Sequence, residues 1–436
     1  MTEQQQEIPR KYHDAVVHWQ QHNFPDYPAL VESWDRYFPK DPPFCLCAKL
    51  APAGSDMIEH GDRMGQPRAV EPRELDEKAA HELFGNIQVQ ASTEFGSIRQ
   101  HQGTLARARD EQDRAWVLRV MAEELRHGYQ MVHLLTSADW SPVTDEKPED
   151  TVERLLLAQT GSYPLAAFNL EFDSFLDNIV FAGFIDRVGK YQLTMQKASA
   201  YKPYAQSMPP MLKEEAFHLA AGVMPLRRWV EKAATGDPLI SMQSIQKAIN
   251  KWFGRGLEMF GYEQDPQNSE LLKLGLKDRT NAEAQEQWIE ECAQMLADLN
   301  RRYIRARLPS KSPAEADAIA KRLLEEVGTV DGIAADEMLR LPDRHFFRRQ
   351  YSYAYEMYGV DGTKFTDVDA YVKHVAQHLP EAYLNSRDVQ HYVANLRKVV
   401  AGEMTIRDAR KNTPHLARVG GGCPCANSVR WVVDAA

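Results

Sequence analysis

The pattern Glu-Glu-x-x-His occurs twice in the chain, at residues 123–127 and at residues 214–218. In each copy the second glutamate and the histidine are three residues apart, so on a helix both side chains lie on the same face. Apolar residues flank both copies, such as Val120 before the first and Met211 before the second. A carboxylate on an apolar helix face is costly unless it is protonated, paired or bound to a metal. Two such copies in one chain therefore restrict the folds it can adopt.

The two copies lie in the second and the fourth of four long helical patterns. Apolar residues recur at helical spacing over residues 79–108, 111–137, 165–200 and 204–234. Pro209 and Pro210 are expected near the start of the fourth helix, where proline is tolerated. Four long helices without strands predict an all-α fold built on a four-helix bundle.

The spacing within each pair of helices predicts two further carboxylates. In an antiparallel hairpin, residues at the same height lie equally far from the turn. The first turn is near residue 109, and Glu124 follows it by 124 − 109 = 15 residues, so its partner is expected near 109 − 15 = 94, which is Glu94. The second turn is near residues 200–201, and the same argument for Glu215 leads to residue 186 or 187, of which the first is Asp186. The first and third helices therefore each offer a carboxylate at the height of the repeated pattern.

This arrangement is that of a di-iron carboxylate site, in which two helices each give one carboxylate and two others each give Glu-x-x-His. Four carboxylates and two neutral imidazoles carry a charge of −4, which matches two divalent irons, and hard oxygen ligands leave iron oxidisable. Each histidine is expected to donate its other ring nitrogen to an acceptor that the sequence does not identify. The predicted metal ligands are Glu94, Glu124, His127, Asp186, Glu215 and His218, and the four carboxylates among them are the predicted catalytic residues.

Glu123 and Glu214 precede the two predicted glutamate ligands in the chain. Each points about 100° away from its neighbour around the helix. They are therefore interpreted as outer or surface carboxylates rather than as ligands. Small residues near the predicted ligands, Gly96, Gly128, Gly183, Gly189 and Gly222, suggest room for a metal pocket.

Composition restricts the partners and the compartment. The 436 residues include 52 Lys+Arg and 62 Asp+Glu, so the formal net charge is −10, which argues against binding nucleic acid or membrane surfaces through a general positive field. No run of about 18 apolar residues predicts a membrane span, and the N-terminus lacks the apolar region of a signal peptide. Five cysteines, an odd and sparse count, favour a reducing cytoplasm. Their two Cys-x-Cys pairs do not have the spacing of zinc ribbons.

The distribution of proline and glycine divides the chain into four expected parts. Residues 1–78 are rich in both and are expected to form an irregular segment that wraps the fold. Residues 79–235 form the bundle, and residues 236–327 add further helices. Residues 328–436 are mixed in pattern and end in a Gly- and Cys-rich tail that is expected to be flexible.

The predicted ligands and their neighbours resemble a known family. Glu94, Glu124-x-x-His127, Asp186-Arg187-x-Gly189-Lys190 and Glu215-x-x-His218 are similar to motifs of the ferritin-like di-iron oxygenase subunits of aerobic, CoA-dependent aromatic degradation. That family includes the phenylacetyl-CoA and benzoyl-CoA epoxidases. Aspartate at position 186 and the run that follows it resemble the benzoyl-CoA 2,3-epoxidase branch more closely. The resemblance covers residues 80–235 strongly and residues 328–385 loosely.

The resemblance implies a function and its partners. The six ligands would bind two iron ions, and dioxygen would be the co-substrate. One oxygen atom would be added across an aromatic C=C bond of an aryl-CoA thioester, with benzoyl-CoA and its 2,3-epoxide as the first expectation. Electrons would come from NADPH through a separate reductase, because the chain has neither a Rossmann glycine motif nor a ferredoxin cysteine set. Candidates to bind the CoA phosphates are Arg107, Arg109, Lys197, Lys202, Arg344, Arg348 and Arg349.

Other functions remain open at this point because a fold does not fix a reaction. A bundle with the same ligands could serve a di-iron monooxygenase that hydroxylates or N-oxygenates another substrate. The chain could also be a non-catalytic, ferritin-like scaffold or metal-binding protein. Such a scaffold is expected to have lost ligands, whereas all six are present here.

Overall fold

The computed structural model describes residues 4–7, 29, 32, 34–36, 39, 47–52, 54–262, 266–326, 328–350 and 353–411. Cys45 and the tail that was expected to be flexible, with Cys423 and Cys425, lie outside these residues. No helix in the described part of the chain is long and apolar enough to cross a membrane.

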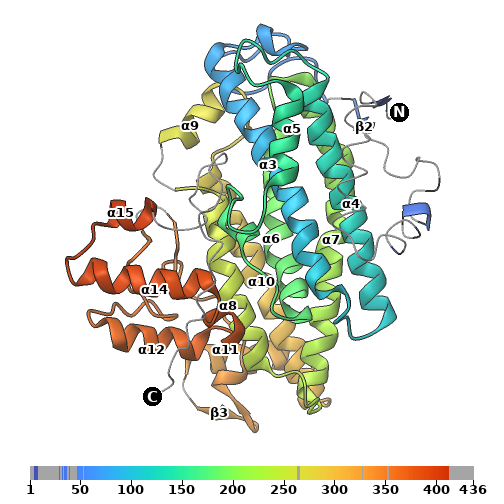
Figure 1. The fold of residues 1–436 in the computed structure, drawn as a ribbon. Helices are drawn as coiled ribbons and strands as arrows, with labels where there is room; N and C mark the ends of the chain where they lie inside the picture. The colour runs from blue at the N-terminus through green and yellow to red at the C-terminus, as the bar shows by residue number, and fades with distance from the viewer. Residues whose placement is uncertain are drawn as a thin grey trace.

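Four long helices form the bundle at the centre of the molecule (Figure 1). They are α3 (Glu77–Leu105), α4 (Glu111–Thr136), α6 (Phe175–Gln196) and α7 (Lys202–Ala234). Helices α3 and α4 form one hairpin and α6 and α7 the other, and α4 also packs on α7. The predicted all-α, ferritin-like fold is confirmed. Strands in the described residues are short, in two antiparallel pairs, β1 (Gln4–Glu7) with β2 (Cys47–Leu50) and β3 (Thr329–Val330) with β4 (Ile333–Ala334).

Side-chain caps explain where the bundle helices begin. The Asp110 side chain accepts a hydrogen bond from the Asp113 backbone N–H at the start of α4, and Ser174 caps α6 by accepting from Asp177. Helix α6 therefore starts at Phe175, and the predicted start at residue 165 was wrong. The chain before the cap instead forms a short 3-10 turn, η2 (Ala166–Asn169).

Prolines inside α7 differ from the prediction and attach the N-terminal segment. Helix α7 begins at Lys202, so Pro209 and Pro210 lie in its interior instead of near its start. Because Pro210 has no N–H, the Gln206 carbonyl four residues earlier loses its helical partner. The Ala51 backbone N–H, next to β2, donates to that carbonyl at 2.9 Å. The proline thus frees an acceptor to which the N-terminal segment binds.

Helices α6 and α7 approach closely where Gly222 faces the α6 backbone. A Cβ atom on Gly222 would lie 2.7 Å from the Ala182 carbonyl carbon and would also clash with the Gly183 nitrogen. A Gly222→Ala variant is therefore expected to lose about 1–3 kcal/mol of unfolding free energy through overpacking. Thermal unfolding of the metal-free protein measures this change.

Gly85 in α3 offers a matched control for this substitution. A Cβ atom on Gly85 would meet no atom within 4 Å. Alanine has the higher helix propensity, so Gly85→Ala is expected to stabilise the protein by up to about 1 kcal/mol. Equal shifts for the two variants would show that the close approach of α6 and α7 does not restrict position 222.

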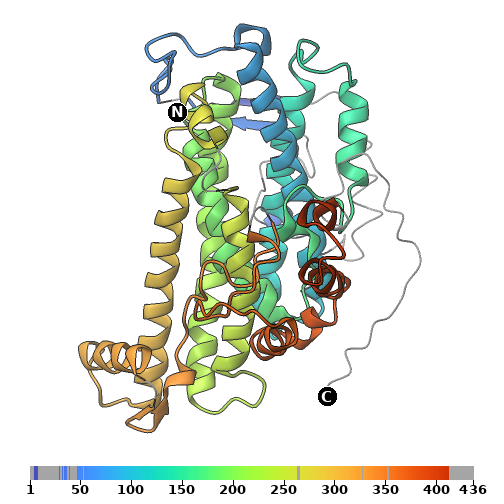
Figure 2. The ribbon, with the colours of Figure 1, turned by 90° about the vertical axis from the view of Figure 1, so that its left-hand side faces the viewer.

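Further helices surround the bundle. Helix α5 (Pro148–Leu157) packs on α3 and α4, and α8 (Met242–Met259) packs on α6. The long α10 (Asn281–Arg307) packs on both α6 and α7 (Figure 2). The short η1 (Pro72–Glu74) precedes α3, and η3 (Ala335–Glu337) follows β4. The division of the chain into four parts stays a prediction. The remaining helices are α9 (Pro266–Lys273), α11 (Pro313–Glu325), α12 (Val368–His378), α13 (Glu381–Leu384), α14 (Arg387–Val400) and α15 (Ile406–Lys411).

Candidate metal centre

The six predicted ligands converge inside the bundle. They come from α3 (Glu94), α4 (Glu124, His127), α6 (Asp186) and α7 (Glu215, His218), and all are buried. Glu94, Glu124 and His127 each offer one ligand atom, and these atoms lie within 4.8 Å of one another; the same holds for Glu124, Asp186 and His218. Glu124 thus belongs to both groups. The Glu215 Oε2 atom lies 3.5 Å from His218 Nδ1.

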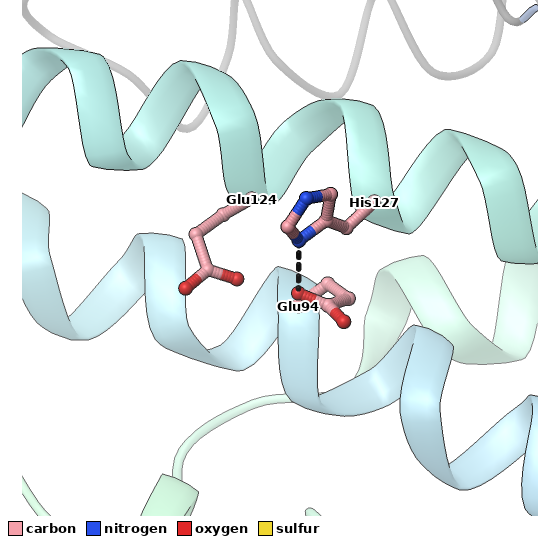
Figure 3. Close-up of side chains that lie close together, drawn as sticks. All are labelled: Glu94, Glu124 and His127. Carbon is pink, nitrogen blue, oxygen red and sulfur yellow. Dashed lines mark ion pairs between the residues drawn. The ribbon is translucent and has the colours of Figure 1, made fainter. Parts of the chain in front are cut away.

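The side chains of α3 and α4 point toward one another across the helix pair. Figure 3 shows Glu124 and His127 on α4 directed at Glu94 on α3, with His127 Nδ1 3.6 Å from Glu94 Oε2. Equal distance from the turn predicts Glu94 and Glu124 at the same height, and the structure brings them together. That these residues bind metal stays a proposal.

Crowding of buried carboxylates shifts their proton affinities. Burial raises the pKa of Glu124 well above its usual range, and the neighbouring Glu94 raises it further. Burial likewise raises the pKa of Asp186 to about 8. For Glu94, burial acts in the same direction but is outweighed by hydrogen bonds with Glu124 and His127, so its pKa is lowered. The cluster therefore needs protons or cations to balance its negative charge.

The outer nitrogen of each histidine lies against a glutamate of the opposite helix. His127 Nε2 on α4 is 3.1 Å from Glu214 Oε2 on α7, and His218 Nε2 on α7 is 3.1 Å from Glu123 Oε2 on α4. Two arginines hold these glutamates in turn, Arg126 Nη1 at 2.6 Å from Glu214 and Arg119 Nε at 2.9 Å from Glu123. The contact of His127 with Glu214 is a hydrogen bond, whereas that of His218 with Glu123 is an ion-pair contact whose two atoms have no hydrogen-bond partner. The acceptor beside each histidine is the glutamate that precedes a predicted ligand.

The electrostatic effect of these glutamates is strong. Burial opposes the charged form of His127, but Glu214 and Glu94 outweigh it and raise the pKa of His127 to about 10. The pKa of His218 is also raised, because Glu215 and Glu123 outweigh the effect of burial. An anionic acceptor at Nε2 fixes the ring orientation and leaves Nδ1 directed at the cluster.

Unpartnered polar atoms test whether the site fits a metal. His127 Nδ1, His218 Nδ1, Asp186 Oδ2 and Glu215 Oε2 are buried and have no hydrogen-bond partner. Such atoms are rare in folded proteins unless a water or an ion binds them. All four face one cluster whose donors are carboxylate oxygens and imidazole nitrogens, a set that suits iron. The residues therefore fit a di-metal centre.

A cavity of about 230 Å³ adjoins the cluster. Glu94 and Glu215 line it, together with residues of α3 and α6, whereas neither histidine does. Gly189 makes room for the Glu215 carboxylate, because a Cβ atom there would lie 3.2 Å from Glu215 Oε1. Gln90 also lines the cavity and accepts a hydrogen bond from Tyr204 Oη at 3.0 Å. A molecule in the cavity would thus meet the carboxylate side of the cluster.

The side of the bundle formed by α4 and α7 is covered. Strand β2 lies on both helices, and the Gln130 side-chain amide of α4 exchanges two hydrogen bonds with the backbone of Lys49, at 2.7 and 2.6 Å. Under this cover the Arg126 and Glu214 side chains are 9% and 16% exposed, whereas the Arg119 side chain is 32% exposed. The cavity is therefore on the α3–α6 side and the outer histidine contacts are on the opposite side.

Most of the cations predicted for CoA phosphates are engaged elsewhere. Arg348 and Arg349 are buried, and Arg349 binds Asp388 at 2.6 Å. Lys202 pairs with Asp56 at 2.7 Å, and Arg344 with Glu286 at 2.9 Å. None of the seven predicted cations lines the cavity beside Glu94 and Glu215. The structure therefore gives no support for the two buried arginines as phosphate ligands.

Comparison with known proteins agrees with the predicted resemblance. Residues 101–316 match the family described as phenylacetic acid catabolic protein, a range that contains five of the six predicted ligands but not Glu94. The chain is 28% identical over 249 residues to benzoyl-CoA oxygenase component B of Aromatoleum evansii. The aligned region covers 54% of this chain. It is 23% identical over 231 residues to a subunit of the 1,2-phenylacetyl-CoA epoxidase of Escherichia coli (strain K12). This second aligned region covers 52% of this chain.

The matched regions cover only part of each relative. The chain spans about half the length of the benzoyl-CoA oxygenase component, 52%, and 71% of the epoxidase subunit. The family match nevertheless includes α4, α6 and α7, three of the four bundle helices, and only the last residues of α3. Residues 101–316 are thus similar to the phenylacetic acid catabolic proteins, in agreement with the motifs.

Proposed function

We propose that this chain is the oxygen-activating component of an enzyme that epoxidises the aromatic ring of an aryl-CoA thioester, with benzoyl-CoA and its 2,3-epoxide as the first expectation. The observation that carries the proposal is the cluster of five buried ligands with Glu215 beside His218, next to a cavity that Glu94 and Glu215 line. The names of the two relatives, an oxygenase component and an epoxidase subunit, support the same class of reaction.

The reaction balances with the partners that the resemblance implies. One atom of dioxygen enters the ring as an epoxide, and the other leaves as water after taking up two protons and two electrons, the electrons coming from NADPH through a separate reductase. Two irons held by the six ligands would supply the chemistry of dioxygen reduction. We infer a separate reductase because the words "component" and "subunit" in the names of the relatives describe parts of larger assemblies.

The chain's own residues have distinct roles in this proposal. Glu94, Glu124, Asp186 and Glu215 hold the metals and balance their charge, and Glu123 and Glu214 orient the two imidazoles. The cavity holds the aromatic ring near Glu94 and Glu215 and limits the access of water. Because the histidines do not line the cavity, the ring approaches from the carboxylate side.

The test supplies iron, NADPH and a reductase to the full chain and offers benzoyl-CoA, phenylacetyl-CoA and free benzoate separately. Mass spectrometry is expected to show a product heavier by one oxygen atom with a thioester, and with 18O2 that atom is labelled. Absence of a product from every thioester, with two irons bound per chain, would contradict the proposed substrate class and leave the metal site standing. Labelled product from free benzoate alone would favour a di-iron monooxygenase of another specificity.

A further inference from the structure

A buried lysine lies in the same cavity and has no anionic partner there. Lys277, in the connection between α9 and α10, lines the cavity and is only 5% exposed. Its Nζ atom donates to Gln192 Oε1 and to Asn281 Oδ1, each at 2.8 Å. Both acceptors are neutral side-chain amides. No carboxylate of the described residues forms an ion pair with Lys277, in contrast to the buried Lys251, which binds Asp173 and Asp177.

A buried ammonium group with only neutral partners is unusual. Charged groups inside proteins are generally paired, because their removal from water is costly. Burial lowers the pKa of Lys277 to about 8, although Asp278 opposes the shift. An ammonium group has three N–H donors, and two of them are used here. The third is available to a ligand in the cavity.

The surroundings of Lys277 favour an oxygen atom with partial negative charge. Asn281 is the first residue of α10, so Lys277 lies by the end of that helix where the backbone N–H groups give a positive potential. The cavity walls also include apolar side chains that suit an aromatic ring, namely Val89, Leu165, Leu193, Met259 and Leu271. A ligand with an aryl group and one acceptor oxygen matches this lining.

The lysine is close to the metal cluster along α6. Gly189, where an added Cβ atom would lie 3.2 Å from Glu215 Oε1, and Gln192 are three residues apart on α6, which corresponds to about 4.5 Å along the helix axis. Lys277 Nζ is in turn 2.8 Å from Gln192 Oε1. The Lys277 ammonium group and the Glu215 carboxylate thus lie beside the same short stretch of α6 and line the same cavity.

We propose that Lys277, held by Gln192 and Asn281, binds the acyl carbonyl oxygen of the thioester and thereby positions the aromatic ring against Glu94 and Glu215. This inference rests on the proposed function, because it concerns the substrate of the same site. A carbonyl fits better than a CoA phosphate, because a cavity of about 230 Å³ is small even for a drug-sized ligand. The nucleotide part of CoA would then remain outside the cavity.

The experiment compares two ligands that differ only at the carbonyl. Benzoyl-CoA carries it, and S-benzyl-CoA has a methylene group in its place. Dissociation constants are measured by calorimetry on iron-loaded protein without reductase, so that no turnover occurs. The wild-type protein is expected to bind benzoyl-CoA at least about tenfold more tightly, as for a hydrogen bond from a charged donor. Lys277→Met is expected to reduce this ratio to below about threefold.

Controls separate a carbonyl contact from a general effect on folding. Lys273→Met removes an exposed lysine four residues earlier that does not line the cavity, and it is expected to keep the wild-type ratio. Iron content and circular dichroism report on folding. If Lys277→Met does not fold, Lys277→Gln replaces it, with the same expected loss of the ratio.

The outcomes distinguish this inference from the proposed function. If wild type prefers benzoyl-CoA and the position-277 variants keep that preference, the role of Lys277 is overturned while the proposed substrate class stands. If wild type binds both ligands equally, the carbonyl contact is likewise overturned. If wild type binds neither ligand, the proposed thioester substrate falls, and the inference falls with it.

Discussion

A Glu124→Ala variant is expected to lose most of its bound iron. Glu124 offers an oxygen to both groups of candidate ligands, so its removal weakens two metal positions at once. Glu215→Ala is expected to have a similar effect, because the Glu215 carboxylate lies 3.5 Å from the free nitrogen of His218. Iron per chain, measured after loading and removal of excess metal, is expected to fall from two in the wild type to well below one in each variant.

Stability measurements separate loss of the site from loss of the fold. Burial and the neighbouring Glu94 raise the pKa of Glu124, so its charged form is disfavoured in the metal-free protein, and Glu124→Ala is expected to change the unfolding temperature of that protein little. The wild type is expected to gain about 2.7 kcal/mol when free metal is at 100 times its dissociation constant. The variant is expected to lose this gain.

Glu231 on the same helix as Glu215 provides the control. It is exposed at the surface, where it pairs with Arg302 at 3.2 Å, and such pairs contribute little. Glu231→Ala is expected to retain two irons per chain and the full stabilisation by metal. If Glu124→Ala and Glu215→Ala both retained two irons as well, the assignment of the metal site would be wrong.

Glu123→Gln and Glu214→Gln are each expected to reduce metal affinity by about 10–100-fold without removing a ligand. Each glutamate lies 3.1 Å from the outer nitrogen of a histidine on the opposite helix. Glutamine keeps the shape but removes the negative charge that fixes the imidazole with Nδ1 directed at the cluster. Titration with Co(II) and Fe(II), followed by absorption spectra, measures the affinity of each variant.

Glu291 provides the matched control for this charge change. It is half-buried where α10 packs on α6. It binds Lys190 of α6 at 2.6 Å and Arg187 of α6 at 3.3 Å, and not a histidine. Glu291→Gln is expected to leave metal affinity nearly unchanged. An equal loss of affinity in all three variants would mean that Glu123 and Glu214 act only through net charge, and no loss in any would mean that the histidines do not need them.

Much of the bundle was predictable because its signals are local. Helix periodicity located α3 and α4 to within a few residues, since apolar spacing and the Asp110 cap both lie in the sequence. The predicted start of α6 was wrong because apolar residues lie on both sides of Ser174 and hide the break. Ser174 caps the helix, and the chain before it forms a separate turn. The prolines of α7 were expected near its start but lie in its interior. A segment distant in sequence compensates for them there, because the Ala51 backbone N–H donates to the Gln206 carbonyl.

The sequence by itself determined which residues can be ligands. Two Glu-x-x-His patterns and the equal distance from each turn are properties of helix geometry, and they are sufficient to identify Glu94 and Asp186 as the further carboxylates. Helical spacing fixes the face on which a side chain lies and its height along the axis. It does not fix which helices become neighbours around the bundle.

The tertiary structure alone decided the contacts between helices. The pairing of His127 with Glu214 and of His218 with Glu123 depends on α4 lying beside α7. The cavity depends on α3, α6 and the connection before α10, which brings Lys277 to Gln192 from a position 277 − 192 = 85 residues away. Such contacts follow from how whole helices pack, and packing sums many weak interactions that no short sequence pattern contains.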